Sequence, residues 1–353
     1  MMSRPGVFRR FFGGLWWLLD GTRRLVLNLL FLALLVVLAI AWFGADRRPA
    51  LEEKTALVLN LHGELVEQYS GRGRDLLLAE SFGERQRETR LRDVLAALDA
   101  AADDPKIDRA VLVLDELSGG GTASLREVAA ALARFRKSGK EVVAWGSDYT
   151  QRQYFLAAHA DEVYLHPYGG VTLRGIGGSG LYFKAALDKL GVTVHGFQAG
   201  KYKSAIEPLT LQAPSAEALE ADRAWMSDLW ATWTADVEAA RKLPPGRIAQ
   251  LIDDLPQRMA AVGGDFAQLA LKEKLVDGLK TRDEFRAQII ARGAPADEKN
   301  GTFRQIAFES YLGTVAPKRG PRIGVIVAQG EILDDDAPAG MVGGRTTAEL
   351  VRR

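Results

Sequence analysis

An uninterrupted apolar run near the N-terminus constrains this chain more than any other feature. Residues Leu25 to Phe43 read LVLNLLFLALLVVLAIAWF, with one polar member, Asn28, and no charge. At about 1.5 Å of rise per residue, such a helix is close to 30 Å long, roughly the thickness of the hydrocarbon core of a bilayer. A buried helix of a soluble protein would normally carry a polar face. The run therefore predicts a transmembrane anchor at residues 25–43.

The charges around the anchor predict its orientation. Residues 1–24 carry five arginines against one aspartate, whereas residues 44–54, interpreted as a polar linker, mix both signs. This bias predicts a cytoplasmic N-terminus and a translocated body. A cleaved signal peptide is the alternative, because Ala39-Ile-Ala41 resembles a cleavage site, but the apolar run is long for one and starts late.

Composition excludes several classes of protein. The 353 residues carry a net charge of +1 with acids and bases interspersed, so no nucleic-acid partner is expected. The absence of cysteine excludes disulfides, thiolate metal sites and cysteine nucleophiles. The four histidines, His62, His159, His166 and His195, lack the paired spacing of zinc motifs and are interpreted as structural. We expect no metal and no cofactor.

The body alternates strand and helix patterns. Strands are predicted at Ala56–Leu61, Ala110–Leu114, Val142–Trp145, Val163–Leu165 and Val192–Phe197. Helices are predicted at Leu91–Ala102, from the end of the Gly-rich segment at 118–122 to about Arg136, and at Gln151–Ala158, Leu181–Leu190, Ala216–Arg241, Phe266–Lys274 and Arg282–Ile290. Strands separated by helix-length segments indicate parallel βαβ units, so the body is predicted to be α/β with a C-terminal helical extension. The tryptophans of the long helix at 216–241 are expected to pack against the protein rather than to form a ligand site.

An internal repeat is visible near the C-terminus. Ile323–Asp335 (IGVIVAQGEILDD) aligns without a gap with Ala56–Gln68 (ALVLNLHGELVEQ), and each segment leads to a Thr-led helix start. A second copy is therefore predicted to begin at Arg322, and we expect the natural protein to continue beyond Arg353, because a strand and half a helix cannot bury a core. This gives a first repeat at 55–291, a linker at 292–321 and the start of a second repeat at 322–353.

Two glycine-rich segments could bind phosphates or oxyanions. Gly175-Ile-Gly-Gly-Ser-Gly180 satisfies G-x-G-x-x-G, but no acid follows about twenty residues later, so a nucleotide site is not favoured and close backbone packing is the better interpretation. Ser118-Gly-Gly-Gly-Thr122 lies between a strand and a helix, where backbone N–H groups can hold an oxyanion. Its pattern alone favours a flexible turn.

The segment AGKYKSAIEP places Lys201 and Lys203 two residues apart. A lysine that acts as a base must be neutral, which requires burial or positive neighbours, and it needs a hydroxyl within hydrogen-bond reach. Ser204 is adjacent, but neighbouring residues on an extended segment point opposite ways. On its own, this pattern favours a surface lysine.

Several segments together are similar to a known family. The anchor, the GGGTAS turn, the run from Tyr149 to Pro208 and the restart at RIGVIVAQGEIL resemble the long form of signal peptide peptidase A (protease IV). The resemblance covers nearly the whole chain and implies two tandem ClpP/crotonase-like repeats with a Ser/Lys dyad, the lysine coming from the first repeat and the serine from the second. The family's lysine falls on Lys203. The counterpart of the nucleophile in this first repeat is Gln151, which cannot attack a carbonyl.

The resemblance implies a membrane-anchored serine endopeptidase that degrades apolar, cleaved signal peptides. The serine would lie on the order of fifty residues beyond Arg353, so the chain alone is expected to be inactive. A bacterial inner-membrane location, an extracytoplasmic body and a ring-like homotetramer are implied as well. The alternatives are a non-catalytic membrane-anchored scaffold and a crotonase-type acyl-CoA enzyme.

Overall fold

The computed structural model describes residues 7–44, 51–70, 88–315, 324–338 and 340–352. The chain divides into two compact units, Met1–Leu51 and Glu52–Arg353. Of the predicted linker at 44–54, residues 45–50 lie outside the described residues.

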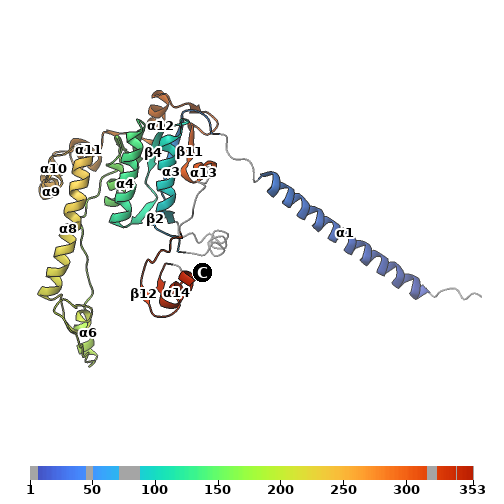
Figure 1. Cartoon of the computed structure of the whole chain (residues 1–353), viewed down its shortest axis with the longest axis horizontal. Helices are drawn as coiled ribbons and strands as arrows, with labels where there is room; N and C mark the ends of the chain where they lie inside the picture. Colours follow the sequence, from blue (N-terminus) through green and yellow to red (C-terminus); the bar gives the residue numbers. More distant parts are fainter. Residues whose placement is uncertain (1–6, 45–50, 71–87, 316–323, 339, 353) are drawn as a thin grey trace, which may run out of the picture. The chain divides into compact units, whose positions relative to one another are not determined.

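The first unit is one long helix, α1 (Val7–Gly44), which Figure 1 shows unbroken. Its segment Trp16–Ala39 is long and apolar enough to cross a membrane, and none of it is buried against protein. The helix includes the predicted anchor at 25–43 and continues on its N-terminal side, where Asp20 pairs with Arg23 and Arg24 at 2.8 Å each. This helix is consistent with a single-pass membrane anchor.

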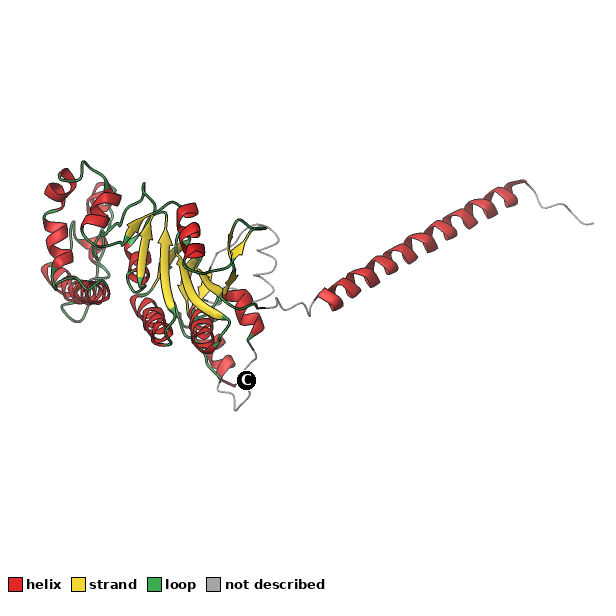
Figure 2. Ribbon diagram, turned by 90° about the horizontal axis from the view of Figure 1, so that it is seen from above, coloured by secondary structure: helices red, strands yellow, loops and turns green. Residues whose placement is uncertain are grey.

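Six parallel strands form the main sheet of the second unit, in the order β11-β1-β4-β6-β7-β8. Their bounds are β1 (Thr55–Asn60), β4 (Ile107–Val113), β6 (Glu141–Gly146), β7 (Glu162–Leu165), β8 (Gly278–Leu279) and β11 (Gln305–Ala307). Each neighbouring pair runs parallel, and Figure 2 shows helices on both sides of the sheet. The predicted α/β class with parallel βαβ units is confirmed.

The helices of the second unit follow the predicted order. They are α3 (Leu91–Asp103), α4 (Thr122–Lys137), α5 (Gln151–Ala157), α6 (Lys184–Lys189), α7 (Glu207–Thr210), α8 (Ala216–Ala240), α9 (Arg247–Asp253), α10 (Leu255–Ala260), α11 (Phe266–Lys272), α12 (Arg282–Ala291), α13 (Phe308–Thr314) and α14 (Gly344–Arg352). The predicted helices therefore form within a few residues of their expected bounds. The tryptophans of α8 differ in role: Trp233 is buried and stacks on Trp230 with ring centroids 5.1 Å apart, whereas Trp225 is exposed.

The core forms because apolar residues on successive strands share a face of the sheet. Val111, Trp145 and Tyr164 line one face and pack in a cluster with Phe285 and Ile289 of α12. The intervening strand residues point to the opposite face, where α3 packs against α4 and α13. Both faces of the sheet are thus covered, as is usual for a parallel sheet.

Short strands form three smaller sheets. β2 (Gly63–Val66), β3 (Glu88–Arg90) and β5 (Leu117–Gly120) pair in parallel, β9 (Ala296–Asp297) pairs antiparallel with β10 (Thr302–Phe303), and β12 (Ile332–Leu333) pairs in parallel with β13 (Val342–Gly343). None of these pairings was predicted, because strands of two to four residues leave little periodic signal.

The C-terminal segment resembles a part of the predicted first repeat. β12 and β13 lead into α14, just as β2 and β3 lead into α3. Gly63 and Gly330, which are equivalent in the sequence alignment, both have positive φ, 60° and 99°. This likeness supports the proposed second repeat. Arg322, its predicted start, lies outside the described residues.

The structure corrects three expectations. The stretch predicted as a linker, 292–321, contains strand β11 of the main sheet and the buried residues Phe303 and Phe308, although its residues 316–321 are not described. Val192–Phe197 is not a strand, because these residues are largely exposed and no strand in the described part of the chain offers them a hydrogen-bond ladder. The described part of the repeated strand pattern, 324–329, is likewise exposed and not a strand.

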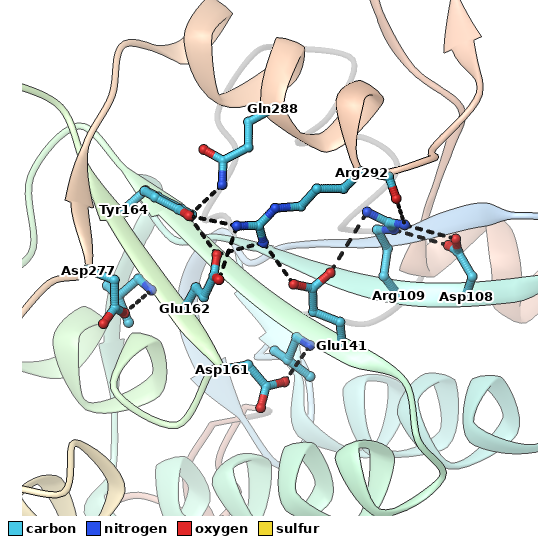
Figure 3. Close-up of polar contacts among 11 residues, drawn as sticks. Asp108, Arg109, Glu141, Asp161, Glu162, Tyr164, Asp277, Gln288 and Arg292 are labelled. Atoms are coloured by element: carbon cyan, nitrogen blue, oxygen red, sulfur yellow. Dashed lines mark hydrogen bonds and ion pairs between the residues drawn. The ribbon is translucent and has the colours of Figure 1, made fainter.

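A charged network joins α12 to the amino-terminal ends of the central strands (Figure 3). The Arg292 guanidinium contacts Glu141 at 2.9 Å and Glu162 at 2.6 Å, and it donates to the Tyr164 hydroxyl at 3.2 Å. Arg109, whose side chain is 8% exposed, donates to the backbone carbonyl oxygen of Arg292 at 3.3 Å. In open α/β sheets, ligands bind at the carboxyl ends of the strands. The network lies at the opposite, amino-terminal edge. We therefore interpret it as a structural clamp.

The clamp predicts an acid-sensitive contribution to stability. Burial raises the pKa of Glu162, but hydrogen bonds from Arg292 and Tyr164 outweigh burial and hold the pKa below its usual value. A carboxylate with a lowered pKa in the folded state stabilises the fold above its unfolded pKa of about 4.3, and this stabilisation is lost as the pH falls through the folded pKa. Glu162→Gln should therefore lower the free energy of unfolding by about 1 kcal/mol at pH 7 and by much less near pH 3. The value at pH 7 is small because the site is partly exposed. Urea unfolding at both pH values measures this, and an equal cost at both would contradict it.

Candidate active site

The chain between β7 and α8 forms an arm, residues 172–215, that contains α6 and α7. Figure 1 shows α6 beside the end of α8 that lies away from α4 and the sheet. The arm begins at an isolated parallel bridge between Tyr149 and Val171, where the Thr172 N–H donates to the Tyr149 carbonyl at 2.8 Å. Its apolar side chains are unusually exposed: Phe197, for example, is 98% exposed. The arm is thus attached at its start and largely exposed along its length.

Lys203 lies on an exposed turn of this arm. Gly200 begins the turn with φ of 105°, and the Lys203 N–H donates to the Gly200 carbonyl at 3.3 Å. The Gly200 conformation is one that residues with a side chain rarely adopt. The turn therefore fixes the backbone of Lys203 while leaving its side chain open to solvent. Among the residues that the structure describes, none buries the Lys203 side chain.

Lys201 stands in a different environment from Lys203. Its ammonium lies over the Tyr202 ring, 4.5 Å from the centroid, and the Tyr202 hydroxyl in turn donates to Glu220 at 3.2 Å. The hydrogen bond with Tyr202 and the charge of Glu220 hold the pKa of Lys201 above its usual value. Lys201 is therefore held protonated, and it is poorly suited to accept a proton.

Glu207 has a structural role at the return of the arm. This buried carboxylate accepts the Ser215 N–H at 3.0 Å and the Ser215 hydroxyl at 2.6 Å, and these hydrogen bonds lower the pKa of Glu207. Ser215 in turn caps α8 by accepting the Ala218 N–H at 3.1 Å. Glu207, which lies three residues after Ser204, thus fixes the start of α8.

The glycine segment Ser118–Thr122 is more regular than its sequence predicts. Gly119 and Gly120 belong to β5 and pair with Glu64 and Leu65 of β2, and Thr122 begins α4. At Gly120 φ is 152°, so the segment uses glycine conformations at the junction of strand and helix. Its backbone serves the small sheet, so the segment is an ordered junction of strand and helix rather than the flexible turn that its pattern favours.

Gln151 contacts the start of the other glycine segment. Its side-chain oxygen accepts the N–H groups of Arg174 and Gly175 at 3.0 and 2.9 Å, and its amide nitrogen donates to the Gly175 carbonyl at 3.2 Å. Gly175 has φ of 74°. No helix begins at Gly180, since α6 starts at Lys184, so the N-terminal helix dipole that a dinucleotide site uses is missing there.

Two acids at the carboxyl ends of strands escaped the sequence analysis. Asp115, which follows β4, accepts both the N–H and the hydroxyl of Ser147 at 2.8 Å. Asp148 accepts the Gly170 N–H at 2.8 Å. The available sequence signal was an acid just after a buried strand. The partners of these carboxylates, however, lie 32 residues from Asp115 and 22 residues from Asp148 in the sequence.

The comparisons with known proteins bear on this part of the chain. Residues 134–292, which include the arm, match the family model described as Peptidase family S49. These residues therefore match a peptidase S49 domain. It is 36% identical over 350 residues to Protease 4 of Salmonella typhi and 34% identical over 353 residues to Protease 4 of Haemophilus influenzae, covering 97% and 96% of this chain. The resemblance inferred from the motifs is confirmed.

The S49 domain and its surroundings make up only part of these relatives. The chain spans 56% of the length of each of the two Protease 4 proteins. Among solved structures, a membrane-bound stomatin-specific protease matches 73% of this chain and 95% of its own, with 10% identity and a TM-score of 0.33. An enoyl-CoA hydratase/isomerase from Marinobacter aquaeolei matches 60% of this chain and 69% of its own, with 13% identity and a TM-score of 0.30.

Proposed function

We propose that this chain is part of a membrane-anchored serine endopeptidase that uses a Ser/Lys dyad to degrade cleaved signal peptides. The observation that carries the proposal is the S49 match at residues 134–292, together with the similarity to Protease 4 over 97% of the chain. The anchor helix α1 adds support, because it would hold the enzyme where membrane-released apolar peptides occur. The arginine-rich N-terminal flank favours a cytoplasmic N-terminus in a bacterial inner membrane, with the body on the extracytoplasmic side.

In this proposal Lys203 is the general base. It removes the proton of a serine hydroxyl as the oxygen attacks the peptide carbonyl, and it then gives that proton to the leaving amine, so that an acyl-enzyme forms and is later hydrolysed by water. The serine belongs to sequence outside these 353 residues. Because Lys203 is exposed here, the neutral amine requires that the domain carrying the serine, or a neighbouring copy in a homotetramer, covers the turn.

Hydrolysis by the full-length protein tests the proposal against the scaffold alternative. Full-length protein in detergent should hydrolyse an apolar peptide ester, and a serine-directed acylating reagent should abolish this activity with one equivalent bound. A scaffold with Gln151 in place of a nucleophile predicts neither hydrolysis nor stoichiometric labelling. Absence of both, in protein whose thermal unfolding is cooperative, would exclude the peptidase.

A further inference from the structure

The side chain of Gln151 binds helix α5 to the outgoing chain of the arm. Tyr149 pairs with Gly170 and Thr172, and Gln151 then closes three hydrogen bonds on the backbone of Arg174 and Gly175. A glutamine side chain that satisfies two N–H groups and one carbonyl fixes both the position and the orientation of a turn. From residue 176 to residue 203, the chain is largely exposed.

Helix α5 also packs against α8, the helix that follows the arm. Phe155, four residues after Gln151, packs against Trp233 of α8 with ring centroids 6.4 Å apart. Phe155 and Trp233 are both buried, at 1% and 5% exposed. One helix of seven residues, with a capping box at Thr150, therefore contacts both the start of the arm and the helix that follows the arm.

Contacts within the arm connect the Gln151 turn to Lys203. Met226 of α8 lies beside Gly178, three residues after the turn that Gln151 holds. Further along, the Phe183 N–H donates to the Pro208 carbonyl at 2.7 Å, and Ile206 packs against Gly196. The backbone around Lys203 is thus tied to the outgoing chain, and the outgoing chain is fixed at Gly175.

We propose that Gln151 is a positioning residue, which holds the root of the arm and so places Lys203 for proton transfer. This inference rests on the proposed function of Lys203. Gln151 does not touch the reacting atoms; it acts through the backbone of residues 174–175. A base displaced by about 1 Å can cost on the order of a hundredfold in rate, so loss of the three hydrogen bonds should affect the chemical step more than substrate binding.

The test uses the full-length protein and three variants near the start of α5. Gln151→Met keeps the length of the side chain and removes its hydrogen bonds, Gln151→Glu keeps the oxygen that accepts two N–H groups, and Arg152→Ala changes an exposed neighbour as the control. We expect kcat for an apolar peptide ester to fall roughly 10- to 100-fold in Gln151→Met with KM within about threefold. Gln151→Glu should recover part of kcat, and Arg152→Ala should match the unsubstituted protein.

Three outcomes would overturn the proposal: an unchanged kcat in Gln151→Met, a loss confined to KM, or equal losses in Gln151→Met and Gln151→Glu with lowered thermal unfolding midpoints. Lys203→Ala is measured beside them. Activity retained in Lys203→Ala would refute the proposed function of Lys203, whereas an inactive Lys203→Ala with a fully active Gln151→Met would refute only the role of Gln151.

Discussion

Lys203→Ala in the full-length protein is expected to lower kcat for an apolar peptide ester by about 10²- to 10⁴-fold, the usual contribution of a general base. The substitution removes the amine but leaves the turn intact, because the turn depends on the Lys203 N–H and on the conformation of Gly200. Lys203 is exposed in this chain, so its replacement should not lower the thermal unfolding midpoint of the chain itself. Steady-state kinetics and thermal unfolding of the same preparation measure both effects.

Lys201→Ala is the matched control for this experiment. Lys201 belongs to the same turn and carries the same charge, but it contacts the Tyr202 ring and is held protonated. Its replacement should change kcat by no more than a few fold. Equal losses in the two variants would show that the turn, rather than one amine, is needed, and an active Lys203→Ala would place the base elsewhere.

Phe285→Ala is expected to give a large loss of stability, about 3–5 kcal/mol, because truncation of a buried phenylalanine leaves a cavity. The Phe285 ring is 2% exposed and lies 6.3 Å from the Trp145 ring and 5.9 Å from the Tyr164 ring, between α12 and the sheet. Its loss would loosen the helix that carries Arg292 of the charged clamp. Urea unfolding monitored by tryptophan fluorescence, which reports on Trp145, measures this change.

Phe197→Ala is the control for the loss of an aromatic ring without a cavity. Phe197 is 98% exposed on the arm, so its truncation should change the free energy of unfolding of the chain by less than about 0.5 kcal/mol. A loss below about 1 kcal/mol in Phe285→Ala would mean that α12 does not depend on this packing.

The regular part of the fold could be predicted from the sequence because its signals are local. β4 and β6 are short runs of buried apolar residues, and α3 and α4 show helical spacing. β11 could not be predicted in the same way. It has three residues, and it becomes a strand only because β1 offers an unpaired edge about 250 residues earlier in the sequence. In the arm, a strand was predicted but did not form. Val192–Phe197 has β-forming residues, but no strand in the described part of the chain pairs with it.

The candidate site was predictable only in part. Resemblance to a family predicts a role for Lys203, whereas the residue pattern alone favours a surface lysine, and the structure places it on an exposed turn. The contact between Gln151 and Gly175 spans 24 residues and depends on one rotamer, so no periodicity in the sequence reveals it. Asp115 and Asp148 escaped for the same reason.

The attachment of the arm to α5 at its start, and of α8 to α5 behind it, has a consequence for variation among such proteins. Residues inserted into or deleted from the arm need not shift the register of any strand, because the sheet resumes at β8 only after α8 to α11. Loop insertions are inexpensive in free energy when the closing contacts are kept. The length of the segment that carries Lys203 is thus free to diverge while the sheet stays the same.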